Sequence, residues 1–136
     1  MPAWDIGPFA NDLAAAWVRE FLANPGPDVL RDTLDLVAAA ADDDELSLDA
    51  CTRAIAAAEV VAALLRRRHP DLPDSIAAWV AARPVAEPPD RRLIEKAART
   101  ATRVRDRSHL RTLWSDPEDL EAWHAELESL ASRLTS

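Results

Sequence analysis

Glycine is almost absent from this sequence of 136 residues, where only Gly7 and Gly26 occur. The loops that cradle phosphates in common nucleotide-binding folds, G-x-G-x-x-G and G-x-x-x-x-G-K-[ST], need several glycines close together. The sequence therefore excludes both of these nucleotide-binding motifs.

Cysteine, tyrosine and long apolar runs are also scarce. Cys51 is the single cysteine, so the chain can form no disulfide within itself, and tyrosine does not occur. The longest apolar run, 54–65, is interrupted by Glu59 and is shorter than the ~20 residues that a membrane span requires. No basic segment followed by an apolar one opens the chain, as a secretory signal would. These absences predict a cytoplasmic protein with no membrane partner.

What the sequence does contain favours helices. Alanine, leucine and valine dominate an apolar content of 49%, and ten prolines punctuate the chain. Residues that favour strands are few, and no stretch alternates between apolar and polar positions. We therefore predict one all-α domain over residues 1–136, a bundle of about six helices joined by short, proline-rich connections.

Apolar residues at helical spacing place these helices. We expect them over about 12–24, 27–41, 48–69 and 75–83, with two more that begin near 90 and 117. Asn11, Ser47 and Asp74 are the expected N-caps, and Pro27 lies in a first turn, where its missing N–H is tolerated. The third helix is the longest and most apolar, so we expect it at the centre.

Five residues on the apolar stripes serve as a test of the predicted core. We expect the side chains of Trp17, Ile55, Leu64, Leu127 and Leu130 to be buried, because each lies on the apolar side of its helix.

The N-terminal stretch AWDIGPFANDLAAAW carries a recognisable pattern. It resembles the N-terminal signature W-x-x-G-x-F-x-N-D of the domain of unknown function 4259 family. The stretch AIAAAEVVAALLRRRHPDLPDSIAAWV is similar to the middle helix of that family and its exit loop, and SHLRTLW with EAWHAEL is similar to its C-terminal end. The resemblance spans nearly the whole chain and implies no known activity. The matching signature residues are Trp4, Gly7, Phe9, Asn11 and Asp12.

A structural role accounts for this signature. Gly7 permits a tight bend, Pro8 fixes the next backbone angle, and Phe9 is placed for a hydrophobic contact ahead of the Asn11 cap. We therefore expect residues 1–10 to form an ordered lid on the bundle, in preference to a ligand site.

Side chains that could carry chemistry are scattered. His69, His109 and His124 lie far apart and lack the i+4 partner of a metal-binding helix, and the acidic run 42–45 lacks the spacing and glycine of an EF-hand. Cys51 shares an apolar helix face and is expected to be buried and inert. We assign no catalytic, cofactor-binding or metal-binding residue and expect no cofactor.

Charge is divided into blocks along the chain. Residues 1–50 carry a net charge of −9, residues 51–115 carry +6, and residues 116–136 carry −5, which gives −8 in total. Two stripes lie opposite the apolar faces of their own helices, so we expect them to face solvent and not to meet within one molecule. They are the candidate interaction residues: Asp28, Asp32 and Asp35 in the second helix, and Arg92, Lys96, Arg99 and Arg103 in the fifth.

The stripes suggest what the protein does. A protein partner or a second copy could use them, whereas the negative total charge and the lack of a helix-turn-helix glycine disfavour nucleic acid. The favoured hypothesis is a small, acidic, non-enzymatic protein-interaction or regulatory module, similar to immunity proteins. The alternative is a hydrolase or transferase whose fold gathers carboxylates with a histidine, His109 or His124. The identity of the partner and the oligomeric state stay open.

Overall fold

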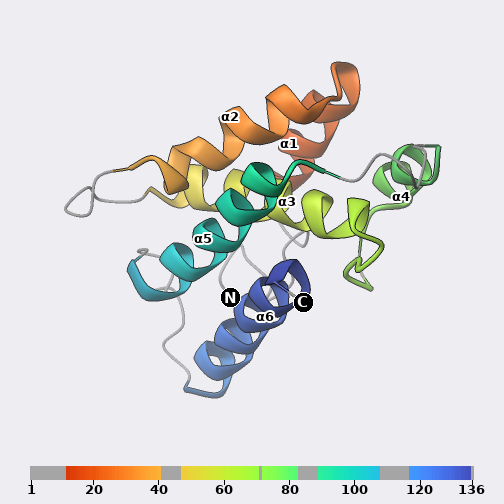
Figure 1. The fold of residues 1–136 in the computed structure, drawn as a ribbon. Coiled ribbons are helices and arrows are strands. Elements are labelled where there is room, and N and C mark those ends of the chain that lie inside the picture. Colours follow the sequence, from red (N-terminus) through yellow and green to blue (C-terminus); the bar gives the residue numbers. More distant parts are fainter. Residues whose placement is uncertain (1–11, 41–46, 71, 83–88, 108–116, 136) are drawn as a thin grey trace.

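The computed structural model describes residues 12–40, 47–70, 72–82, 89–107 and 117–135, which contain six α-helices and no β-strand (Figure 1). This confirms the prediction of an all-α fold. The helices are α1 (Asp12–Ala23), α2 (Pro27–Ala38), α3 (Leu48–Leu64), α4 (Asp74–Ala81), α5 (Arg91–Arg107) and α6 (Pro117–Thr135).

Helix α3 forms the centre of the molecule, as predicted. It contacts each of the other five helices, with α1 and α2 on one side and α6 on the other (Figure 1). Every side chain from 54 to 63 is buried, and most of them are alanine or valine. Such a helix, apolar almost all round, is typical of a protein interior, and its small side chains let neighbouring helices approach closely.

Aromatic side chains join α1 to α2 and α4. The rings of Trp17 and Phe21 are stacked with centroids 5.2 Å apart, and the ring of Trp79 in α4 meets Phe21 edge-on at 5.0 Å. The indole Nε1 of buried Trp17 donates a hydrogen bond to Thr33 Oγ1 in α2 at 3.1 Å. This bond satisfies the one polar group that burial of the indole would otherwise leave unpaired.

The helix starts follow the predicted signals closely, with one exception. The Ser47 hydroxyl accepts a hydrogen bond from the Ala50 N–H at 3.1 Å, and Pro27 opens α2. Asp74, however, is the first residue of α4 and not its cap, because Pro73 occupies the cap position. A first-turn carboxylate there still meets the positive end of the helix.

Helix α3 ends five residues earlier than predicted. Arg66 adopts a left-handed backbone conformation with φ of 64°, and its N–H donates to the Ala63 carbonyl at 2.9 Å. The Arg67 N–H donates to the Ala62 carbonyl at 3.0 Å. These two bonds form a Schellman motif, which satisfies the last carbonyls of the helix and usually contains glycine at the left-handed position. The absence of glycine at position 66 hid this end from sequence reasoning.

Four of the five test residues of the core are buried. Trp17, Ile55, Leu127 and Leu130 are 7% exposed or less, whereas Leu64 is only partly buried. The prediction for Leu64 was wrong because Leu64 is the last residue of α3 and borders an open cleft described below.

The N-terminal signature falls mostly outside the described residues. Trp4, Gly7, Phe9 and Asn11 lie there, together with the expected lid over 1–10, and the structure describes only Asp12, which is exposed at the start of α1. Within the described ranges, no helix combines the length and apolar character that crossing a membrane would need.

Candidate functional site

A cleft of about 620 Å³ lies where the first turns of α2 and α5 meet the ends of α3 and α4. Its apolar lining includes Leu30 of α2, Leu64 of α3, Trp79 of α4 and Leu93 of α5. This volume is within the range of pockets that bind ligands of moderate size. We call it the α2–α5 cleft.

Charged side chains form the rim of the α2–α5 cleft. Arg31 pairs with Asp28, one turn away on α2. Lys96 Nζ lies 2.7 Å from Asp35 Oδ1, so an ion pair joins α5 to α2. The exposed Arg92 guanidinium has no ion-pair partner among the described residues.

The cleft is bordered by the positive ends of two helices. At the start of α5, Asp90 Oδ1 accepts a hydrogen bond from the Arg92 N–H at 3.0 Å. At the start of α2, Gly26 occupies the cap position and provides no side chain to accept a bond from the first turn. The first N–H groups of a helix carry a partial positive charge. The start of α2 beside the cleft has no capping side chain, and only the first-turn carboxylate of Asp28 partly offsets its charge.

The expectation that the two charge stripes do not meet was wrong. Besides the pair between Lys96 and Asp35, Arg103 Nη1 reaches the C-terminal end of α2. It donates to the carbonyl oxygens of Val37, Ala38 and Ala40 at 2.8, 3.1 and 2.7 Å. Helices α2 and α5 pack against each other, so side chains at the flank of an apolar face meet the neighbouring helix before they meet solvent.

The other stripe residues do face solvent. Asp28, Asp32, Arg92 and Arg99 are exposed. Their role in binding a partner stays a prediction, and only Asp28 and Arg92 among these four line the cleft.

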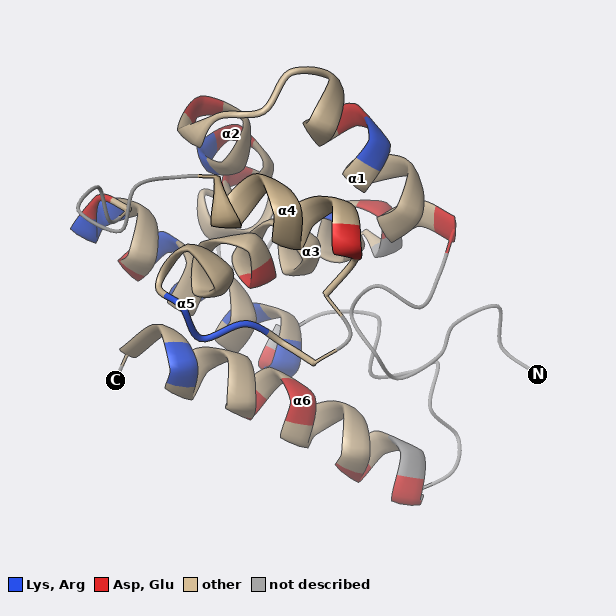
Figure 2. Ribbon diagram, turned by 90° about the vertical axis from the view of Figure 1, so that its right-hand side faces the viewer, with Lys and Arg blue, Asp and Glu red and all other residues tan. Residues whose placement is uncertain are grey.

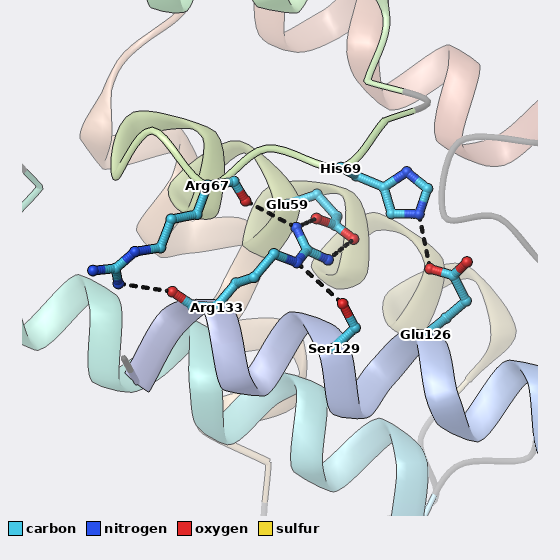
Figure 3. Close-up of polar contacts among 6 residues, drawn as sticks. All are labelled: Glu59, Arg67, His69, Glu126, Ser129 and Arg133. Atoms are coloured by element: carbon cyan, nitrogen blue, oxygen red, sulfur yellow. Dashed lines mark hydrogen bonds and ion pairs between the residues drawn. The ribbon is translucent and has the colours of Figure 1, made fainter.

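A second group of polar side chains lies between α3 and α6, and two of them, Glu59 and His69, are buried (Figure 3). Helix α6 carries acidic residues along its length and one basic residue, Arg133, near its C-terminal end (Figure 2). The Arg133 guanidinium makes a bidentate pair with Glu59, Nη1 to Oε1 at 2.8 Å and Nη2 to Oε2 at 3.1 Å. The Glu59 side chain is 1% exposed, and burial raises its pKa, an effect that Arg133 partly offsets.

The turn after α3 completes the surroundings of Arg133. Its Nη1 also donates to the Arg67 carbonyl at 3.1 Å, and Arg67 Nη1 donates in return to the Arg133 carbonyl at 3.0 Å. Arg133 Nε lies 3.3 Å from Ser129 Oγ (Figure 3). The left-handed residue Arg66 therefore helps to build this group, because it turns the Arg67 carbonyl toward α6.

His69 extends the buried group to a second residue of α6. Its Nε2 lies 2.8 Å from Glu126 Oε2, and the His69 side chain is 7% exposed. We had expected His69 at the C-terminus of α3, but the earlier end of that helix places it in a loop that packs on α6. We refer to Glu59, His69, Glu126 and Arg133 as the α3–α6 joint.

The α3–α6 joint brings together a histidine and two carboxylates, the combination that the enzyme hypothesis needs. The histidine is not one of the two that we singled out for that role: His109 lies outside the described residues, and His124 Nε2 is buried with no hydrogen-bond partner among them. No joint residue lines the α2–α5 cleft or the smaller hollow between the end of α3 and α4. The contacts of the joint connect α3 and the turn after it to α6.

Sequence reasoning missed the joint, although one signal was present. Glu59 is the only charged residue in the apolar run 54–65, and a carboxylate at the centre of a buried helix requires a partner. Nothing in the sequence identified Arg133 as that partner, because the two residues are 74 positions apart. The described residues contain no group of three or more histidine, cysteine or acidic side chains that could hold a metal ion.

Comparison with known proteins gives one match. The family model described as Domain of unknown function (DUF4259) matches residues 2–126 of the chain. No curated protein and no solved structure matches. The last two turns of α6, which carry Arg133, lie beyond the matched range.

Proposed function

The chain belongs to the family Domain of unknown function (DUF4259), and we propose that it is a non-enzymatic protein-interaction module that binds its partner in the α2–α5 cleft. The observation that carries this proposal is the cleft itself, which combines an apolar lining with a charged rim. Interfaces of this composition are typical of specific protein binding, in which a desolvated apolar centre is surrounded by polar groups.

The alternative, a hydrolase or transferase, draws its support from the 2.8 Å contact between His69 and Glu126. A catalytic histidine must reach its substrate. The His69 side chain is 7% exposed and lines neither of the two hollows described above, so it offers little surface to a substrate. The geometry therefore favours the interaction module.

The narrower form of the proposal is a regulatory, immunity-protein-like module in the cytoplasm. The net charge of −8 supports it, because a strongly acidic protein attracts basic partners over long distances and speeds their encounter. The single cysteine, Cys51, supports the cytoplasm, since disulfides form and persist mainly outside it.

A quantitative pull-down from lysate of the source organism tests the module. Three bait proteins are compared: the wild type and two variants. Leu64→Glu adds a charge to the cleft lining, and Leu36→Glu makes the matched change on the exposed face of α2 outside the cleft. We expect at least one protein to be retained by the wild type and Leu36→Glu but lost by Leu64→Glu. Thermal melting identifies a Leu64→Glu protein that does not fold, in which case Pro89→Glu, at the cleft but outside the helices, replaces it.

Two outcomes would contradict the proposal. If the same proteins bind wild type, Leu64→Glu and Pro89→Glu equally, the cleft is not the binding surface. If wild-type protein turns over ester, amide or phosphoester substrates and His69→Ala abolishes the turnover while the fold persists, the enzyme hypothesis replaces it.

A further inference from the structure

We propose that the α2–α5 cleft recognises an extended segment of a partner protein in which one carboxylate lies next to bulky apolar side chains. This inference rests on the proposed function and specifies the chemistry of the bound segment. Three features of the cleft carry it: a cation with no ion-pair partner among the described residues, a helix start without a capping side chain and an apolar lining.

Among the described residues of the rim, Arg92 is the cation that no ion pair occupies. The other two basic side chains of the rim are already paired, Arg31 with Asp28 and Lys96 with Asp35. The exposed Arg92 guanidinium has no such partner in the described part of the chain, and its planar donors fit a carboxylate in bidentate geometry.

The helix start at Pro27 adds a second attraction for negative charge, which the carboxylate of Asp28 in the same first turn reduces but does not cap. Gly26 provides no capping side chain, and a Cβ built on Gly26 would meet no atom within 4 Å, so the space beside this helix start is open. Because Pro27 and Arg92 line the same cleft, one ligand in the cleft can contact both the Arg92 guanidinium and the start of α2.

The acidic residues of the rim limit how much negative charge can bind. Asp28 and Asp90 line the cleft together with its three cations, and Asp35 neutralises one of those cations. A doubly charged phosphate would meet these carboxylates at close range, whereas a single carboxylate is matched by the Arg92 guanidinium, which has no ion-pair partner in the described ranges. Like charges brought together at an interface discriminate against the wrong ligand.

The apolar lining requires more of the ligand than a carboxylate. Leu30, Leu64, Trp79 and Leu93 come from four different helices and surround a volume of about 620 Å³. One carboxylate leaves most of this volume unfilled, so bulky apolar side chains must occupy it to displace water from the lining. A segment of extended chain provides a carboxylate and apolar groups within a few residues.

Peptide selection tests this inference directly. A phage library of random peptides is selected on the wild-type domain and depleted on Arg92→Glu, at a salt concentration near 150 mM that screens the net charge of the protein. We expect the retained peptides to be enriched in an aspartate or glutamate beside leucine, isoleucine, phenylalanine or tryptophan. Calorimetry then measures the best synthetic peptide against its amide analogue, in which the carboxylate is replaced by asparagine or glutamine.

We expect the amide analogue to bind about tenfold more weakly than the acid, a change typical for loss of one charged contact at an interface. The variant Arg92→Glu should lose at least as much affinity for the acid peptide, and Arg92→Lys should recover part of that affinity. The matched control is Arg91→Glu, a neighbouring residue that pairs with Glu95 and does not line the cleft, and it should change the affinity less than twofold.

Several results would overturn the inference. One is the absence of enriched peptides, and another is equal affinity for the acid and the amide. A third is displacement of the peptide by octanoate at the same concentration as the peptide itself, which would identify a site for small amphipathic acids.

The pull-down separates this inference from the proposed function. If Leu64→Glu removes a captured protein but Arg92→Glu does not, the proposed function stands and this inference fails. If the peptides behave as expected and Leu64→Glu changes no captured protein, the proposed function fails.

Discussion

Charged side chains gather in two regions of this molecule that differ in their access to water. In the α3–α6 joint, Glu59 and His69 are nearly inaccessible and each has a partner on α6. At the α2–α5 cleft, Asp28 and Arg92 are exposed. Charges of the first kind are costly to bury and must stay paired, whereas charges of the second kind add little to stability and can change partners. The comparison separates side chains that hold the fold from those available for binding.

Removal of Arg133 should produce the largest difference between the two regions. In Arg133→Ala, the buried Glu59 carboxylate loses both hydrogen bonds that Arg133 donates to it, so we expect a loss of about 3–5 kcal/mol in the free energy of unfolding. The surface control Arg31→Ala removes an exposed pair and should cost less than about 1 kcal/mol. Urea denaturation measures both.

A double variant shows whether the cost comes from the unpaired charge. Glu59→Met combined with Arg133→Leu removes both charges and keeps apolar volume, so it should recover most of the stability lost in Arg133→Ala. If Arg133→Ala and Arg31→Ala cost the same, the joint does not behave as a buried ion pair, and the contrast between the two regions disappears.

Arg103 and Arg99 provide a contrast within one helix. Because Arg103 donates to three carbonyls at the end of α2, we expect Arg103→Ala to lower the free energy of unfolding by about 1–2 kcal/mol. Arg99 is exposed, so Arg99→Ala should lower the free energy of unfolding by less than about 0.5 kcal/mol. The sequence predicted that both arginines face solvent, which would make the two alanine variants equally stable. Equal melting temperatures for the two variants would favour that earlier expectation.

The sequence predicted the helices well because their signals are local. Apolar spacing, the Ser47 cap and Pro27 each act within a few residues, and the structure confirms them. The end of α3 was missed because Arg66 adopts a conformation that usually signals itself by a glycine.

The candidate site was harder to predict because it depends on contacts between distant segments. The sequence identified Arg92 and Asp28 as candidate interaction residues, but it could not show that the starts of α2 and α5 border one cleft. The pairs between Lys96 and Asp35 and between Arg133 and Glu59 join residues 61 and 74 positions apart, which only the packing of the helices determines.

The turn between α3 and the joint allows a smaller test. Glycine adopts the left-handed conformation of Arg66 without steric cost, whereas alanine does not, so Arg66→Gly should be more stable than Arg66→Ala by about 1 kcal/mol. Both variants lose the hydrogen bond from Arg66 Nη1 to the Val80 carbonyl, and their comparison cancels that loss. Arg68 does not have this conformation, so Arg68→Gly should be no more stable than Arg68→Ala. The same preference at both positions would show that the backbone at Arg66 is not strained.

The pH dependence of Glu59 should give the smallest effect, because Arg133 offsets part of the burial. Burial raises the pKa of Glu59 in the folded protein above its ordinary value of 4.5. At pH values between the unfolded and the folded pKa, the folded protein therefore binds more protons than the unfolded chain. The stability that Glu59 contributes is therefore complete below about pH 4.5 and is lost as the pH rises through the folded pKa.

Chemical denaturation of the wild type and of Glu59→Gln between pH 4 and 8 isolates this contribution, since groups elsewhere titrate alike in both proteins. The stability of the wild type relative to Glu59→Gln should fall as the pH rises and then become constant. His69, Glu126 and Arg133 face the same carboxylate, and His69→Gln provides the control for their influence. A relative stability that increases with pH would mean that the attraction of Arg133 exceeds the cost of burial, and the joint would then stabilise the charged form of Glu59.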